Sequence, residues 1–169
     1  MNAPAISIRE ASDADLPEML EIFNHEVVES PYLYVETPLT LDDRQAWLNQ
    51  HRAASLPVLV VTDPRVLGYA SLSPYRPSSG YRFTGEVSVY VAHFAQRRGL
   101  GARLLSSLFD EARRRGLHAL VASIDSENAP SIALFERCGY AEAARLPEVG
   151  RKFDGWRTQL LLIRRLEQS

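Results

Sequence analysis

Residues Gln96–Arg103 (QRRGLGAR) place two glycines among three arginines, between a strand-like and a helix-like stretch. Residues 82–91 alternate between the two faces of a strand, with valines on one face and Glu86, Ser88 and Tyr90 on the other. Residues 101–115 carry apolar side chains at spacings of four. Gly99 and Gly101 permit a tight turn and leave no Cβ in the way of a ligand. Because the start of a helix presents unpaired N–H groups that attract anions, the pattern predicts a phosphate-binding loop.

Two common phosphate-binding motifs do not fit this loop. A Walker loop ends in Gly-Lys-Ser/Thr, whereas this one ends in Gly101-Ala102-Arg103. A dinucleotide-binding fingerprint requires a third glycine at position 104, which is leucine here. The alternative interpretation is a solvated turn whose arginines serve solubility.

The rest of the chain predicts one mixed α/β domain over residues 1–169, because strand-like and helix-like patterns alternate along it. Asp13 or Asp15 is a candidate N-cap of the first helix and Thr40 of the second. Strands are expected at 6–9, 58–62, 66–73, 82–91, 118–124, 140–145 and 157–166, and helices at about 13–28, 40–52, 101–115 and 129–138.

Composition narrows the class of protein. A net charge of −2 argues against a general nucleic-acid binder. The one cysteine, Cys138, excludes an internal disulfide and suits a reducing compartment. No signal-peptide pattern is evident, no apolar run approaches the ~18 residues of a membrane span, and the histidines are scattered. We therefore expect a cytoplasmic protein without a membrane, nucleic-acid or metal partner.

The loop resembles the pyrophosphate loop of the GNAT superfamily of N-acetyltransferases, Gln/Arg-x-x-Gly-x-Gly/Ala, which Gln96, Gly99 and Gly101 match. Residues 74–91 (PYRPSSGYRFTGEVSVYV), 124–140 (IDSENAPSIALFERCGY) and 148–156 (EVGRKFDGW) are similar to the branch that contains phosphinothricin and methionine sulfoximine N-acetyltransferases. The resemblance implies the GNAT fold, an α+β arrangement with a mostly antiparallel sheet of about seven strands and about four helices. It also implies that two strands splay apart where acetyl-CoA binds.

The resemblance assigns a set of residues to acetyl-CoA. Backbone groups near Val91 would face the thioester oxygen, where negative charge develops. Asn128 matches an asparagine that contacts the cofactor, although a helix N-cap is the alternative role for it. The full set implied for the cofactor is Val89, Tyr90, Val91, Gln96, Arg97, Arg98, Gly99, Leu100, Gly101, Ala102, Asn128 and Ser131.

Glu86 is the candidate catalytic base, because the acceptor amine must lose a proton and the family places a carboxylate at this position. The residues alone favour an exposed polar side chain on a half-buried strand, and the family match reverses that preference. Phe135 departs from the family, which commonly has tyrosine or histidine there, and phenylalanine cannot protonate the departing CoA sulfur. A thiol has a pKa of about 8.5, so the thiolate can leave without that acid.

The resemblance also outlines an acceptor pocket. Arg76 and Arg82 would bind a carboxylate or phosphinate, unless they are simply surface arginines, and Tyr34 is either a pocket aromatic or a core residue. Residues 148–156 resemble a segment that reaches a neighbouring subunit's site in a homodimer, although Thr158 replaces an acidic residue common there. The implied pocket comprises Tyr34, Arg76, Arg82, Thr84, Glu86, Lys152 and Phe153.

The sequence therefore predicts transfer of acetyl from acetyl-CoA to the α-amino group of a small amino-acid-like acceptor, by direct attack in a ternary complex. Phosphinothricin, methionine sulfoximine and methionine sulfone are the acceptor types that the resemblance implies. Two alternatives stay open. One is acetylation of another amine, such as a polyamine, for which carboxylates would suit the pocket better than arginines. The other is a non-catalytic acetyl-CoA sensor, which the phenylalanine at position 135 keeps open.

Overall fold

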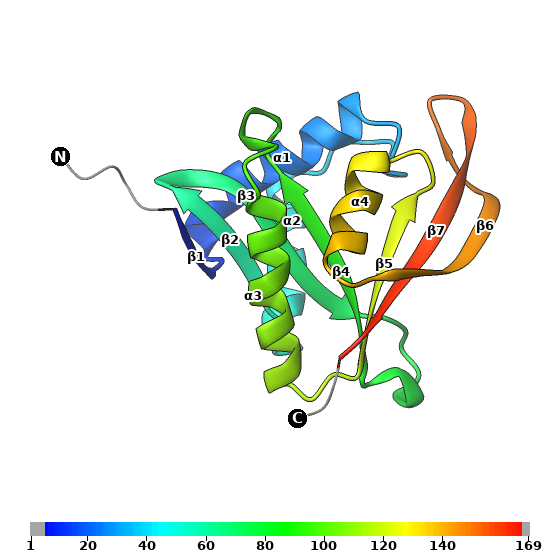
Figure 1. The fold of residues 1–169 in the computed structure, drawn as a ribbon. Helices are drawn as coiled ribbons and strands as arrows, with labels where there is room; N and C mark the ends of the chain where they lie inside the picture. Colours follow the sequence, from blue (N-terminus) through cyan, green and yellow to red (C-terminus); the bar gives the residue numbers. More distant parts are fainter. Residues whose placement is uncertain (1–5, 167–169) are drawn as a thin grey trace.

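The computed structural model describes residues 6–166, which form a seven-stranded sheet in the order β1-β2-β3-β4-β5-β7-β6 (Figure 1). Only β4 and β5 are parallel, and the other neighbouring strands are antiparallel. The strands are β1 Ser7–Glu10, β2 Val58–Asp63, β3 Arg65–Pro74, β4 Thr84–Val91, β5 Ala119–Asp125, β6 Ala141–Lys152 and β7 Gly155–Arg165. The mixed, mostly antiparallel sheet that we predicted is confirmed.

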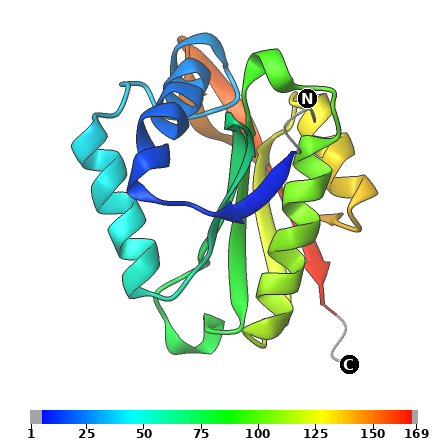
Figure 2. The ribbon, with the colours of Figure 1, turned by 90° about the vertical axis from the view of Figure 1, so that its left-hand side faces the viewer.

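Four α-helices cover the two faces of the sheet. Helices α1 (Leu16–Glu29) and α2 (Leu41–Ala53) lie on one face, and α3 (Leu100–Arg114) and α4 (Ala129–Arg137) lie on the other (Figure 2). Short 3₁₀ turns occupy residues 13–15, 79–81 and 93–95. The apolar stripe of α3 is fully buried against β3 and β4, as its spacing of four predicts.

The starts of the first two helices differ in their capping. Thr40 caps α2 as predicted, since its hydroxyl accepts from the Asp43 amide at 3.2 Å while the Asp43 carboxylate accepts from the Thr40 amide at 2.8 Å. Helix α1 begins at Leu16, and neither Asp13 nor Asp15 caps it through its side chain. The Asp15 carboxylate instead binds Arg9, with each oxygen 2.7 Å from a guanidinium nitrogen.

The last two strands are longer than predicted. Strand β6, expected over residues 140–145, continues to Lys152 through Pro147 and Gly150, because a break in the pairing between Leu146 and Gly150 absorbs these residues. Phe153 and Asp154 then form a tight turn with φ of 48° and 60°, which is the conformation that two-residue hairpins favour.

Strands β4 and β5 separate after a short parallel contact. They pair only between Thr84–Glu86 and Ala119–Val121, and beyond these residues each strand continues beside a different neighbour. The second half of β4 therefore has a free edge that faces an opening in the sheet. This is the splayed strand pair expected for the fold.

Candidate active site

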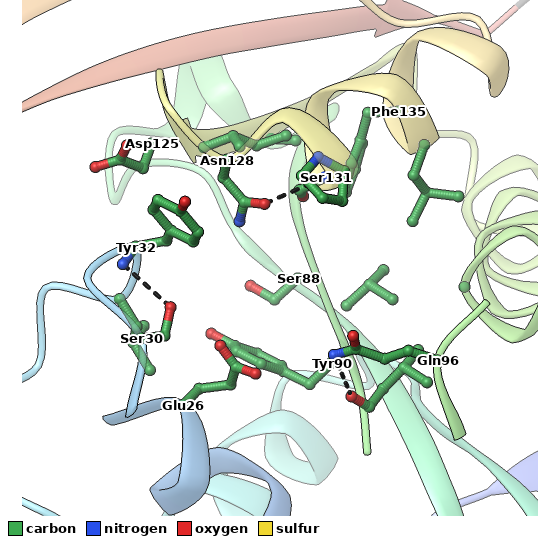
Figure 3. Close-up of a pocket in the computed structure, with 18 of the residues that line it drawn as sticks. Glu26, Ser30, Tyr32, Ser88, Tyr90, Gln96, Asp125, Asn128, Ser131 and Phe135 are labelled. Atoms are coloured by element: carbon green, nitrogen blue, oxygen red, sulfur yellow. Dashed lines mark hydrogen bonds between the residues drawn. The ribbon is translucent and has the colours of Figure 1, made fainter. Parts of the chain in front are cut away.

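A cavity of about 710 Å³ lies at this opening (Figure 3). Its floor is the free edge of β4 with the end of β5, residues 87–91 and 122–125. One wall comes from α1 and the chain that follows it, residues 25–33. The other walls are the glycine-rich loop with the start of α3 and one face of α4. The opening in the sheet therefore joins all these elements into one site.

The glycine-rich loop gives one end of the cavity an anion-binding character. Gly99 has a φ of 73° directly before α3, so its backbone adopts a conformation that favours glycine. The N–H groups at the start of α3 face the cavity end formed by Leu100, Gly101 and Ala102. Together with the positive end of the helix dipole, they favour a phosphate there.

The three arginines of this loop have different surroundings. Arg97 lines the cavity, whereas Arg98 lies 3.6 Å from the Asp63 carboxylate and Arg103 donates to the Ile6 carbonyl at 3.3 Å. The structure thus brings Gln96, Arg97 and residues 99–102 of the predicted phosphate site together and leaves Arg98 outside the lining.

Gly101 has a second reason to be glycine, which the sequence did not indicate. It lies in the first turn of α3, and a Cβ there would come within 2.8 Å of a methyl carbon of Leu134 on α4. The missing side chain lets α3 and α4 approach closely at the phosphate end of the cavity.

Helix α4 contributes Asn128, Ser131 and Phe135 to the cavity wall. Asn128 caps the helix, since its Oδ1 accepts from the Ser131 amide at 3.3 Å, so the capping role left open by the sequence is present. Capping uses only the oxygen of Asn128, and the side chain still lines the cavity (Figure 3). Phe135 is buried, with its ring edge against Tyr140 at a centroid distance of 5.0 Å.

Glu86 lies at the start of the opening. It stands on the same face of β4 as Ser88 and Tyr90, and its carboxylate accepts a hydrogen bond of 2.9 Å from the Ser123 hydroxyl of β5. Ser123, Ser88 and Tyr90 line the cavity. Glu86 does not line it, but it contacts Ser123, which does. A proton can therefore pass from the cavity to Glu86 through Ser123 or a water molecule.

Tyr90 projects from β4 towards α1. Its ring stacks on Tyr69 at 5.2 Å and meets Phe23 edge-on at 5.4 Å. Burial raises the pKa of Tyr90 to about 12, so its hydroxyl stays protonated at neutral pH. The buried Arg44 lies behind these rings, where its guanidinium donates to the Tyr69 hydroxyl.

The Asp125 carboxylate joins three segments at the end of β5. It accepts two hydrogen bonds of 2.8 Å from Arg157 on β7 and one of 2.8 Å from the Tyr34 hydroxyl. The Glu127 amide is a fourth donor, also at 2.8 Å. Burial alone would raise the pKa of Asp125, but these donors outweigh it and lower that pKa below its usual range.

Tyr34 therefore lies behind the cavity wall, and Tyr32 is the tyrosine of this segment that lines the cavity. The other six residues predicted for the acceptor pocket, Glu86 among them, also lie outside the lining. Arg76 and Arg82 are exposed on the loop before β4, Thr84 begins β4, and Phe153 is exposed at the β6–β7 turn. Lys152 is buried, and its ammonium donates to the carbonyls of Val27, at 2.6 Å, and Val35.

Sequence reasoning missed several cavity residues. Glu26, Tyr32, Ser123 and Asp125 lie on three separate segments, and no spacing along the chain connects them. Only the register of β4 against β5, which pairs Glu86 with Val121, places Ser123 beside Glu86. Glu26 could have been named as a candidate from the sequence, because it is an acidic residue in a helix that covers the sheet.

No helix within residues 6–166 is long and apolar enough to span a membrane. In the same part of the chain, no group of three or more His, Cys, Asp or Glu side chains is placed to hold a metal ion.

Comparison with known proteins agrees with this geometry. An L-methionine sulfoximine/L-methionine sulfone acetyltransferase of Pseudomonas paraeruginosa is 45% identical over 152 residues, which cover 89% of this chain and 88% of that protein. A phosphinothricin N-acetyltransferase of Streptomyces coelicolor is 36% identical, and the match covers 88% of this chain and 89% of that protein. The structure of a Salmonella typhimurium acetyltransferase with its cofactor acetyl-CoA superposes with a TM-score of 0.94 at 39% sequence identity. The superposition covers 98% of this chain and 96% of that chain.

The family assignment rests on the sequence and the fold together. The model of the acetyltransferase (GNAT) family matches residues 18–140, which include the glycine-rich loop, both splayed strands and the helices around the cavity. The chain belongs to the GNAT family of acetyltransferases.

Proposed function

We propose that this protein transfers the acetyl group of acetyl-CoA to the α-amino group of a small amino-acid-like acceptor by direct attack. The observation that carries the proposal is the cavity between β4 and β5, which has an anion-binding loop at one end and Glu86 beside the other. Cys138, the only cysteine, lies outside the cavity lining, so it offers no thiol for a covalent acetyl-enzyme.

The residues present fit acetyl-CoA, which supplies the activated acetyl group when it is bound. Gly99, Arg97 and the N–H groups at the start of α3 suit the pyrophosphate. The free edge of β4 offers backbone groups to the pantetheine arm. An N–H near Val91 would stabilise the charge that develops on the thioester oxygen.

Glu86 accepts the amine proton in this proposal, and Ser123 holds its carboxylate in place. Val91 and Glu86 lie on opposite faces of the same strand, so β4 presents the acetyl group and the base from fixed positions. Phe135 offers no proton to the sulfur, and the low basicity of a thiolate allows it to leave unaided.

The acceptor class is supported by the names of the relatives, which act on methionine sulfoximine, methionine sulfone and phosphinothricin. Arg76 and Arg82 remain our candidates for the acceptor carboxylate. They lie on the loop next to the Glu86 end of β4, and neither has a carboxylate partner among residues 6–166. Acetylation of a different amine is the second candidate, because carboxylates of α1 also line the cavity.

Replacing Glu86→Gln tests the proposal. The amide keeps an oxygen for the Ser123 hydroxyl but cannot take a proton at neutral pH. We expect kcat to fall by about 10²- to 10⁴-fold with L-methionine sulfoximine, while the affinity for acetyl-CoA stays unchanged. The measurement is CoA thiol release as a function of pH, from about pH 6 to 9, together with acetyl-CoA binding by calorimetry.

Glu136→Gln, on the exposed side of α4, is the matched control and should retain full activity. Full activity of Glu86→Gln across the pH range would refute the role of Glu86. Tight acetyl-CoA binding without turnover on any amine would favour the sensor alternative.

We also propose that the protein is a cytoplasmic homodimer. The β6–β7 hairpin carries three exposed apolar side chains, Val149, Phe153 and Trp156, and Trp156 is 63% exposed in the isolated chain. A second copy that covers this hairpin would bring it near the partner's cavity, as the resemblance implies. The single cysteine is compatible with a reducing compartment.

A further inference from the structure

Glu26 places a carboxylate in the cavity that the catalytic scheme above does not use. It projects from α1 towards Tyr90 (Figure 3), and its carboxylate adds to the rise that burial causes in the pKa of both Tyr90 and Tyr69. Among residues 6–166, the Glu26 carboxylate has no hydrogen-bond or ion-pair partner. Glu26 therefore offers a free acceptor of hydrogen bonds to whatever enters the cavity.

Among residues 6–166, no arginine or lysine forms an ion pair with the Glu26 carboxylate. Arg157 forms an ion pair with Asp125, and the Lys152 ammonium donates to backbone carbonyls. Arg44 is 3% exposed behind the tyrosine rings, where its charge opposes that of Glu26 on both tyrosines, but it lies outside the cavity lining and cannot contact an acceptor there. The α1 wall therefore carries net negative charge, to which the exposed Glu29 of the same wall adds.

The orientation of the acceptor follows from the proposed function, on which this inference rests. In that function the amine would lie near Glu86 and Ser88, and the acceptor carboxylate would extend towards Arg76 and Arg82 on the loop before β4. The acceptor side chain then extends in the opposite direction along β4, towards Tyr90 and Glu26.

We propose that Glu26 selects the acceptor by its side chain, favouring a group that donates a hydrogen bond over one that only accepts. A sulfoximine carries an N–H that can donate to a carboxylate. A sulfone presents only oxygen lone pairs, and a phosphinate carries a negative charge that the carboxylate repels. The order of preference is therefore methionine sulfoximine, then methionine sulfone, then phosphinothricin.

The test compares kcat/KM for these three acceptors in the wild-type protein and in Glu26→Gln. A glutamine side chain has nearly the same shape, carries no charge, and offers an N–H₂ group that can donate to a sulfone oxygen. We expect the sulfoximine-to-sulfone ratio to fall by about 10-fold, because the sulfoximine N–H would then donate to a neutral amide oxygen instead of a charged carboxylate, while the sulfone gains a donor. The rate with phosphinothricin should rise.

Glu21→Gln is the matched control, because Glu21 lies on the same helix outside the cavity lining, and its ratio should equal that of the wild type. An unchanged ratio in Glu26→Gln would overturn the inference. An equal loss with all three acceptors would also overturn it, since Glu26 would then bind the ammonium group that they share.

Calorimetry can measure the affinity for the same acceptors in the presence of CoA, so it tests this inference independently of the proposed function. If the wild-type protein released no CoA thiol with any amine, the proposed function would fail. The ratio of binding affinities in wild type and Glu26→Gln would still decide whether Glu26 selects the side chain.

Discussion

Two kinds of carboxylate can be distinguished at the scale of single residues. Asp15 and Asp125 are buried, and each is held by two hydrogen bonds from one arginine. Glu26 and Glu86 have no arginine partner among the described residues, and they lie in or beside the cavity. The fold thus pairs with arginine the carboxylates that hold segments together and leaves unpaired those that can meet an acceptor.

The pair formed by Arg9 and Asp15 predicts a pH-dependent contribution to stability. The hydrogen bonds from Arg9 lower the pKa of Asp15 to about 2, against an unfolded value of about 3.9. Because the folded pKa is the lower one, this stabilisation is complete above about pH 4 and is lost as the pH falls through about 2. Asp15→Asn should therefore cost about 1 kcal/mol of unfolding free energy at neutral pH.

Urea unfolding of both proteins at a series of pH values measures this difference, which should shrink as the pH falls from about 4. Asp42→Asn is a suitable control, because Asp42 is exposed and has no ion-pair partner in the described part of the chain. A difference that stays constant down to about pH 2 would contradict the assignment of the stabilisation to the ionised carboxylate.

At the scale of elements, the free edge of β4 depends on close packing against β3. Gly68 on β3 lies so near β4 that a Cβ would come within 2.7 Å of the Tyr90 carbonyl oxygen. We expect Gly68→Ala to cost about 1–3 kcal/mol of unfolding free energy, because backbone atoms must move apart. Since Tyr90 and Val91 line the cavity, acetyl-CoA should also bind more weakly.

Thermal unfolding and acetyl-CoA titration of the variant test both effects together. Gly80→Ala is the matched control, because a Cβ at Gly80 would meet nothing within 4 Å. Equal stability of the two variants would show that β3 and β4 tolerate the added methyl group.

The elements also show how far the sequence predicts this protein. The strands, the four helices and the glycine-rich loop follow from periodicity, glycines and caps, which are local signals. The extension of β6 through Pro147 and Gly150 does not, because it depends on pairing with β7. Ser123 beside Glu86, and Tyr34 bonded to Asp125, likewise depend on contacts between distant segments.

At the scale of the whole molecule, the exposed hairpin predicts the oligomeric state. Light scattering should give twice the mass of one chain, and Trp156→Glu should shift the protein towards the monomer, because a charge would have to be buried in the contact. Phe94→Glu, at another exposed aromatic residue outside the hairpin, should leave the mass unchanged. A wild-type monomer at all accessible concentrations would exclude the dimer.

Lys152 has a consequence for the chemistry of the molecule as a whole, because it is the only lysine in the chain, beside eighteen arginines. Its amine is 3% exposed and fixed between two carbonyls, so the folded surface of residues 6–166 presents no primary amine to an acylating reagent. A protein that handles a reactive thioester is thereby protected from random acylation of its own side chains. Modification of Lys152 by such a reagent would report on unfolded molecules in a sample.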